Sequence, residues 1–424
     1  MVYSFYPIMF CANYLIRGAT RPSVSKKHIS LPFDSESHYL DCLSDLSLFR
    51  NFLASLFASH PELFPQDFAS GFTFHDSYLS KKLNLKVRRI KLKANGEVFY
   101  LRPSFLFPYL ISRTDEVEKA LYLRQWGVPF DALAYVFGRD AMFWYRAWIR
   151  LGESNLVGTT VKKIEAMPED LIADEKITWV CGKEISLPTT VAAGCFLGIT
   201  AVEKDDTEGL LSGYGEFKKE ASQVFPQYYP RSICTDGWKA TREAWRLLYP
   251  KIVMVLCYLH SVLKISERCR GKRRQEVLTK VWEVYKSENK QKFSQRVRRL
   301  KEWSMEKLEG AALEMVMKLW KRRKEFLVAY QCPQAARTSN GVDRLLNRVD
   351  RMLYAASYGH ATSESMRKAV RAMALQWNFH PYGRRLRQRE ATRKSPFADL
   401  NGFVYHENWL HNLLIASSMG GLRL

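Results

Sequence analysis

The chain has 424 residues, enough for two or three domains that each bury their own core. Apolar residues make up 47% and aromatic residues 13% of the sequence, which excludes an extended disordered protein. The formal charge of +22 at pH 7 predicts a polyanionic partner, and nucleic acid is the first candidate.

Membrane binding is the competing explanation for a basic chain. No apolar stretch of about 18 residues occurs, so we expect no contact with a membrane through a spanning helix. Residues 2–16 are apolar but lack a basic start and a small-residue cleavage site, which argues against a signal peptide. The eight cysteines form no Cys-x-x-Cys pair, as expected of reduced thiols. These features predict a cytoplasmic protein, associated with the nucleoid if the partner is DNA.

Residues 1–110 are expected to form an accessory α+β region. Apolar residues at helical spacing predict helix from about 33 to 83. Alternating residues then predict two strands between 86 and 102. Asn95-Gly96 between them predicts a hairpin turn, because both turn positions need positive φ.

Residues 127–152 have the spacing of a helix-turn-helix, within an expected DNA-binding domain of residues 111–160. Leu133 would line the first helix, Gly138 would make the turn, and Phe143 would pack the second helix on the first. Four side chains would then be free to meet phosphates or base edges: Arg139, Tyr145, Arg146 and Arg150. The alternative is two ordinary packed helices.

The most regular stretch lies between residues 170 and 268. Strands are predicted over 171–180, 184–193, 195–202, 232–235 and 252–257, and helices over 206–225, 239–249 and from 260 onward. Three strands in succession, followed by alternating helices and strands, resemble the order of a ribonuclease-H-like α/β domain. We expect this domain to comprise residues 165–268 and 336–380.

Residues 269–335 carry no strand pattern and are rich in Lys and Arg, which predicts a basic, all-helical insertion. Trp282, Trp303 and Trp320 fit no single helix face, so each is expected in the core of its own helix. The alternative role for one of them is stacking on an unpaired base. Residues 381–424 are expected to form a C-terminal tail.

Three acidic residues stand out from their surroundings. Asp174 lies in a β-branched apolar run, Asp236 ends another in Thr-Asp-Gly, and Asp343 lies just inside a helix. A carboxylate at the end of a buried strand is costly unless it binds a cation or pairs with a base. This set therefore suggests a divalent metal site.

Residues 170–380 resemble the DDE transposases of bacterial insertion sequences, and the pattern is most similar to the Mutator-like group. Asp174 and Asp236 match the first two acids, and Cys257-x-x-His260 matches the Cys/Asp-x-x-His signature. Ser339-Asn340-Gly341-Val342-Asp343 matches the third motif with Asp in place of Glu, so Asp350 and Glu364 remain alternatives for that position.

The resemblance implies a transposase that binds the terminal inverted repeats of its element, cleaves there and joins the ends to target DNA. The implied catalytic residues are Asp174, Asp236, Asp343 and His260, and the three aspartates would bind two Mg²⁺ ions, for which Mn²⁺ could substitute. Pairing two double-stranded DNA ends implies a homo-oligomer. Two other functions stay open: a catalytically inactive DNA-binding protein derived from a transposase, and a ribonuclease-H-like nuclease.

Several neighbouring residues have simpler explanations. Cys257 and His260 supply two ligands where a structural zinc ion needs four, and a core histidine is the plain alternative for His260. Strand alternation predicts that Glu175 points away from Asp174. Asp205 and Asp206 precede a helix and are expected to cap it.

Overall fold

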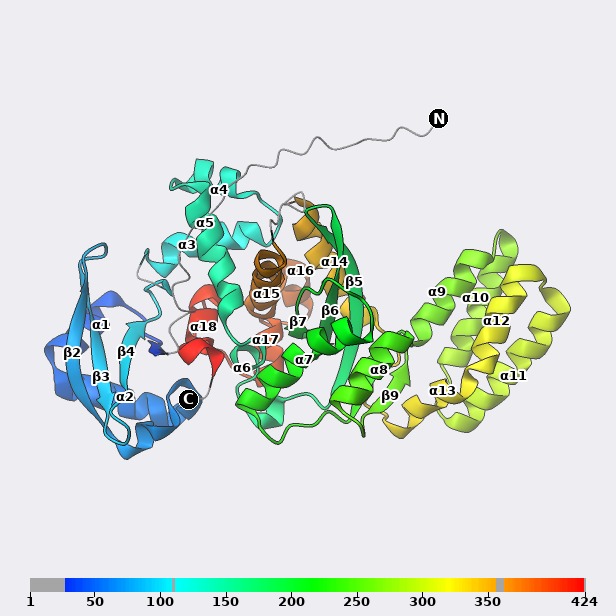
Figure 1. Ribbon diagram of the computed structural model, residues 1–424, viewed down its shortest axis with the longest axis horizontal. Helices are drawn as coiled ribbons and strands as arrows, with labels where there is room; N and C mark the ends of the chain where they lie inside the picture. The colour runs from blue at the N-terminus through cyan, green and yellow to red at the C-terminus, as the bar shows by residue number, and fades with distance from the viewer. Residues whose placement is uncertain (1–26, 109–110, 356–361, 423–424) are drawn as a thin grey trace.

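The computed structural model describes residues 27–108, 111–355 and 362–422. It is a mixed α/β protein with two mixed sheets and about 57% helix. Figure 1 shows a small sheet at one end, an α/β body in the middle and a helical bundle at the other end. The expected combination of α/β and helical parts is confirmed at this level. Residues 2–16, considered above as a signal peptide, lie outside the described part.

The N-terminal sheet has the strand order β1-β4-β3-β2, in which β1 and β4 are parallel and the other pairs antiparallel. Its elements are β1 (His28–Leu31), α1 (Glu36–Ser44), α2 (Leu46–Ser59), η1 (Pro61–Leu63), η2 (Gln66–Ser70), β2 (Phe72–Ser80), β3 (Leu85–Leu92) and β4 (Val98–Pro103). The hairpin at Asn95-Gly96 is confirmed, but of its two turn residues only Gly96, with φ +73°, has positive φ. The helix predicted as far as 83 is wrong beyond residue 70, because Phe72 to Ser80 pair with β3.

Short helices connect this sheet to the central body. They are α3 (Thr114–Arg124), α4 (Phe130–Phe137), α5 (Ala141–Ile149), η4 (Arg150–Glu153), α6 (Leu156–Thr160) and η5 (Ile164–Ala166). The turn predicted between α4 and α5 is present, with positive φ at Gly138 (+70°) and Arg139 (+62°). Leu133 and Ala147 are fully buried between the two helices and the central body.

The central sheet has the strand order β7-β6-β5-β8-β9. Its strands are β5 (Asp170–Val180), β6 (Lys183–Ala192), β7 (Cys195–Ile199), β8 (Ser232–Thr235) and β9 (Val253–Leu256). The pairs β5–β6 and β6–β7 are antiparallel, whereas β8 is parallel to both β5 and β9. All five strands lie within a few residues of their predicted positions.

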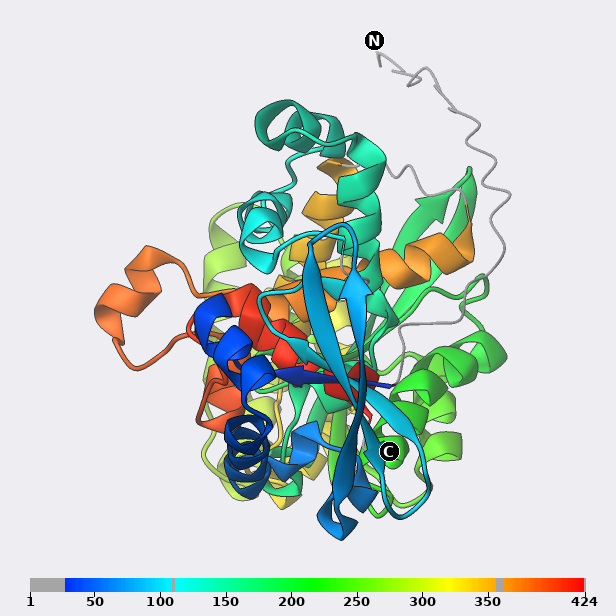
Figure 2. The same ribbon diagram turned by 90° about the vertical axis from the view of Figure 1, so that its left-hand side faces the viewer.

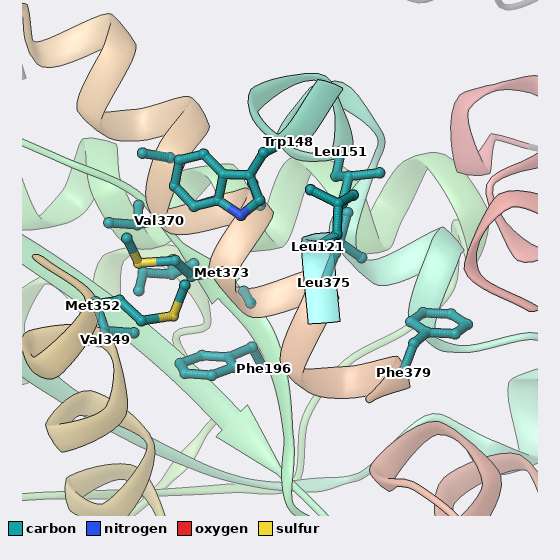
Figure 3. Packing of buried hydrophobic residues seen from close by; sticks show 14 of the residues in the cluster. Leu121, Trp148, Leu151, Phe196, Val349, Met352, Val370, Met373, Leu375 and Phe379 are labelled. Atoms are coloured by element: carbon teal, nitrogen blue, oxygen red, sulfur yellow. The ribbon is translucent and has the colours of Figure 1, made fainter. Parts of the chain in front are cut away.

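Helices cover both faces of this sheet (Figure 1). On one face α7 (Thr207–Val224) and α8 (Lys239–Leu248) pack on Leu171, Ala173 and Ile233. On the other face α14 (Asn340–Ala355) and α15 (Ser363–Phe379) pack on the side chains of β6. Figure 3 shows how Met352 of α14 and Met373 of α15 meet Phe196 and Trp148 in this core.

The region between β9 and α14 is entirely helical, as predicted. It contains α9 (Tyr258–Arg268), α10 (Lys272–Tyr285), α11 (Lys290–Lys307), α12 (Gly310–Lys321), α13 (Arg323–Leu327) and η6 (Val328–Gln331). Trp282, Trp303 and Trp320 are partly buried against a separate core that includes Val281 and Val316. Within the described residues, no helix combines the length and apolar character needed to cross a bilayer.

The expected C-terminal tail is instead part of the folded body. It forms α16 (Arg384–Arg389), α17 (Pro396–Asn401), α18 (Trp409–Ala416) and η7 (Ser418–Gly421). Every residue of α18 is buried, and Ile415 and Met419 belong to the core of the N-terminal sheet. The apolar face of this helix therefore joins the N-terminal sheet to the central body (Figure 2).

Candidate active site

Two of the predicted acids belong to neighbouring parallel strands of the central sheet: Asp174 lies within β5, and Asp236 directly follows β8. Ile172 of β5 is paired with Cys234 of β8, and Asp174 and Asp236 each come two residues later. Because side chains alternate along a strand, both carboxylates leave on the side of Ile172. The register of β5 and β8 therefore brings Asp174 and Asp236, which are far apart in the sequence, to neighbouring positions.

The start of α14 lies over β5. A Cβ atom built on Gly341 would come within 3.3 Å of Ile172 Cδ1, so the first turn of α14 packs closely on β5. Asp343 lies in this first turn, and its backbone N–H donates to Ser339 O at 3.0 Å. The third predicted acid is thus carried to β5 by a helix more than a hundred residues away in the chain.

Ser339 and Cys257 link α14 to α9. The Ser339 N–H donates to Cys257 Sγ at 3.1 Å, and Ser339 Oγ donates to Asp343 Oδ2 at 2.9 Å. One residue further on, the Tyr258 N–H donates to Arg337 O at 2.9 Å. These bonds fix the start of α9, which carries His260, against the start of α14, which carries Asp343.

The electrostatic environment of Asp174 reflects this crowding. Burial, together with the negative charges of Glu175 and Asp343, raises the pKa of its carboxyl group to about 8, and His260 opposes this shift. A raised carboxyl pKa means that the ionised form is poorly compensated where it lies. The site therefore favours either a proton or a cation on Asp174.

His260 is a positive charge that acts on Asp174. Its hydrogen bond with Cys257 is the largest cause that raises its pKa to about 9, and Asp174 and Asp236 also favour the charged imidazole. The pKa of the Cys257 thiol is lowered, first by its hydrogen bond with Cys234 and then by those with His260 and Ser339. His260 is thus an interacting member of the acidic group and not an isolated core histidine.

Glu175 points to the opposite face of the sheet, as strand alternation predicts. Its Oε1 accepts hydrogen bonds of 2.6 Å from Tyr214 of α7 and from Thr241 of α8. Burial raises the pKa of Glu175 despite these two donors. Asp206 is the N-cap of α7, also as expected, and accepts from the Gly209 N–H at 2.8 Å.

The two alternatives for the third acid have ion-pair partners elsewhere. Asp350 lies 3.5 Å from Lys176 Nζ. Glu364 pairs with Arg367 at 2.8 Å, and this guanidinium lowers the pKa of Glu364. Neither Asp350 nor Glu364 is among the main charges that shift the pKa of Asp174 or His260. Asp343, in contrast, raises the pKa of Asp174. Asp343 therefore stays the prediction for the third acid.

The loop after Asp236 is held in place by the helical insertion. Asp236 Oδ1 accepts from the Trp238 N–H at 2.7 Å, and Gly237 has φ +88°. A Cβ atom on Gly237 would lie 2.4 Å from Leu256 Cδ1 and 2.5 Å from Arg322 Nη2. Arg322 in turn shares Glu325 with Arg242 of α8. The positive φ favours glycine here, and a larger residue would also displace the side-chain ends of Leu256 and Arg322.

The donor set has the chemistry of a hard-cation site. Three carboxylates from β5, the β8 end and α14 offer oxygen ligands, and their mutual repulsion is offset by a single imidazole. In the described part of the chain, however, no three His, Cys, Asp or Glu side chains are already gathered closely enough to form a coordination shell. For zinc, Cys257 and His260 remain two ligands only, and the sulfur already accepts the Ser339 N–H.

The four candidate DNA-binding side chains fall into two pairs. Arg146 is exposed, and Arg139 has a side chain 56% exposed at 3.8 Å from Glu116. Tyr145 is half-buried against Phe130, with ring centroids 5.6 Å apart. Arg150 lies in η4 and lines an internal cavity. The turn before α5 and the outer surface of α5 thus offer Arg139 and Arg146, whereas the other two face inward.

Two parts of the site gave no sequence signal. Cys234 lies beside Cys257, although the two are 23 positions apart and form no motif. The contacts of Ser339 with both Cys257 and Asp343 depend on the return of the chain from the helical insertion. The Ser-Asn-x-x-Asp spacing placed Ser339 one helical turn before Asp343 but not beside Cys257.

Comparison with known proteins identifies no family for this chain. A scan against protein-family models gave no match, and a search of curated proteins gave none either.

Proposed function

We propose that this protein is a metal-dependent phosphoryl-transfer enzyme acting on DNA, of the DDE transposase type with a ribonuclease-H-like catalytic domain. The observation that carries the proposal is the placement of Asp174 and Asp236 by the neighbouring parallel strands β5 and β8, with the start of α14, which carries Asp343, packed on Ile172 of β5. The strand order β7-β6-β5-β8-β9 is the order expected for such a domain, with three antiparallel strands followed by two parallel ones.

Asp174, Asp236 and Asp343 would hold the metal, with two Mg²⁺ ions as the expected complement and Mn²⁺ as a substitute. When bound, these ions would activate water or a 3′-hydroxyl and stabilise the leaving oxygen. The raised pKa of Asp174 supports this assignment, because a divalent cation would offset the charge that burial and Asp343 make unfavourable. Modest movement of the three side chains would be needed to complete the coordination shell.

The protein supplies two further functions around the acids. The protonated imidazole of His260 would bind the scissile phosphate at physiological pH, since its pKa lies at about 9. The basic helical insertion contacts the Asp236 loop through Arg322, so DNA bound to the insertion would reach the acids directly. Arg139 in the turn before α5 and Arg146 on α5 would contact the terminal inverted repeat, and a homo-oligomer would hold two ends and the target DNA.

The test is cleavage of a duplex that carries the end of the element, in the presence of Mg²⁺. Asp174→Asn and Asp236→Asn should each abolish nicking and retain DNA binding, because each removes a charged ligand and keeps the side-chain volume. Asp350→Asn is the matched control, since its carboxylate pairs with Lys176 instead. Wild-type nicking by either of the first two variants would refute the metal-site assignment.

The same assay separates the two alternatives. A catalytically inactive DNA-binding protein would bind the duplex without nicking it under any metal condition. A nuclease of the same fold would nick the duplex but would not join a 3′-hydroxyl end to a second DNA. The transposase proposal requires joined products that depend on Asp174.

A further inference from the structure

A cavity lies between the N-terminal sheet, α18 and η4, away from the acidic residues. β1 and α18 lie side by side there (Figure 2). Its polar lining includes His28, Ser30, Arg102, Arg150, Ser154 and Ser417, with Leu151 and Leu413 among the apolar lining residues. The described residues that line it include cationic and hydroxyl side chains but no Asp or Glu.

Arg102 is the buried charge in this cavity. Arg102 is only 5% exposed. Its Nη2 donates to Ser30 Oγ at 2.6 Å and to Leu414 O at 3.4 Å. Its Nε is buried without a hydrogen-bond partner, and within the described residues the guanidinium makes no ion pair. Burial alone lowers its pKa to about 10, with no opposing contribution from an acid.

Two other buried arginines show how this chain normally compensates such a charge. Arg371 pairs with Glu220 and donates to Gly152 O at 2.9 Å. Arg124 lies over the Phe130 ring at 4.5 Å and the Trp148 ring at 5.1 Å, and donates to Val128 O at 3.1 Å. Among the residues that the structure describes, neither a carboxylate nor an aromatic ring contacts the Arg102 guanidinium. A buried cation without such compensation is costly.

We propose that the cavity is a binding site for a phosphate-type oxyanion, held by the guanidinium of Arg102 and by hydroxyl groups of the cavity wall. The planar fork of an arginine side chain matches two oxygens of a tetrahedral oxyanion. Ser154 adds a hydroxyl group that can donate to a further oxygen, and the hydroxyl of Ser417 could do so in place of its bond to Leu414 O at 3.1 Å. The anion is either free phosphate or a phosphate of the DNA backbone, and the site shares no residue with the acidic group.

Such an anion would also stabilise the joint between two bodies. Arg102 belongs to β4 of the N-terminal sheet, whereas Leu414 belongs to α18 and Arg150 to η4. A ligand that binds only the folded joint raises its stability by mass action. The site therefore links anion binding to the position of the N-terminal sheet on the central body.

The experiment measures thermal unfolding of the full chain at constant ionic strength, with chloride replaced stepwise by inorganic phosphate, and separately with a short duplex. We expect Tm to rise by about 2 °C for each tenfold increase of phosphate above its Kd. Arg102→Met should abolish this rise. Arg124→Met, which removes an equally buried arginine outside the cavity, should retain it even if its starting Tm is lower.

A rise in Tm with inorganic phosphate that is lost in Arg102→Met would identify a free anion. A rise in Tm that occurs only with the duplex, and is lost in Arg102→Met, would identify a backbone phosphate. An equal rise in wild type and Arg102→Met, or no rise with either ligand, would overturn the proposal. If Arg102→Met does not fold, Arg102→Lys keeps the charge without the fork and should weaken phosphate binding at least tenfold by calorimetry. Unchanged affinity in that variant would equally overturn the proposal.

Discussion

Replacing Asp174 by Asn should stabilise the metal-free protein, although it should also remove activity. An aspartate carboxyl group has an ordinary pKa of 3.8, and in the folded protein that of Asp174 is raised to about 8 by burial, Glu175 and Asp343. The difference corresponds to about 4 kcal/mol of lost stability at pH 7, where the carboxyl group is ionised in the unfolded chain and mostly protonated in the folded one. Local relaxation and water entry reduce such costs, so we expect Asp174→Asn to be more stable by about 2 kcal/mol.

The sign of the pH dependence follows from the raised pKa. Below pH 3.8 the group is protonated in both the folded and the unfolded chain, and it costs nothing. As the pH rises towards about 8, the unfolded chain ionises first, so the wild type loses stability that the Asn variant keeps. The difference in unfolding free energy should therefore widen by about 2 kcal/mol between pH 5 and pH 8.

Thermal unfolding of both proteins at pH 5, 7 and 9 measures this difference without any substrate. Asp350→Asn is the matched control and should show no stabilisation, because its carboxylate is paired with Lys176 at 3.5 Å. Adding Mg²⁺ should raise the Tm of the wild type more than that of Asp174→Asn. An Asn variant less stable than wild type at pH 7, or a difference that does not change with pH, would refute the reasoning.

Three further predictions follow from the same geometry. Asp343→Ala should abolish cleavage and Asp343→Glu should retain part of it, whereas Asp350→Ala and Glu364→Ala should remain active in the same nicking assay; the opposite pattern would move the third acid. Gly237→Ala should lower the unfolding free energy by about 3 kcal/mol, because its Cβ would lie 2.4 Å from Leu256 Cδ1, while Gly182→Ala, with positive φ but open space, should lower it by about 1 kcal/mol. Cys257→Ser should lower the pKa of His260 from about 9 towards 6.5 in an NMR titration, and Cys269→Ser should leave it unchanged.

The strands of the central sheet were predictable because their turns are short and marked. Gly182 and Gly194 end two turns, and each follows a residue that also has positive φ, Cys181 at +47° and Ala193 at +50°. Such two-residue turns fix the register of the flanking strands. With the register of β5 against β6 set locally, the face on which Asp174 and Glu175 lie follows from alternation alone.

Other elements depend on contacts between distant parts of the chain. Ser30 of β1 donates its N–H to Ser418 Oγ, 388 residues later, and no local pattern marks either residue. β2 was read as helix because its apolar residues follow a long helical stretch, and only pairing with β3 settles its conformation. The helix α18 is buried because it packs against two separate cores, which are built from distant parts of the chain. A tail was therefore predicted where the chain folds into the body.

The position of the acidic residues depends both on local sequence patterns and on contacts between distant parts of the chain. Local sequence placed Asp174 and Asp236 at the ends of strands, and the parallel register of β5 and β8 made them neighbours. Asp343 and His260 arrive on helices whose positions depend on the whole insertion between them. A purely structural group would be expected to avoid the cost that ionised Asp174 carries, because a neutral side chain of the same shape would fit. A residue that destabilises its own fold in this way is best explained by a function, and a cation bound by the three acids would remove the cost.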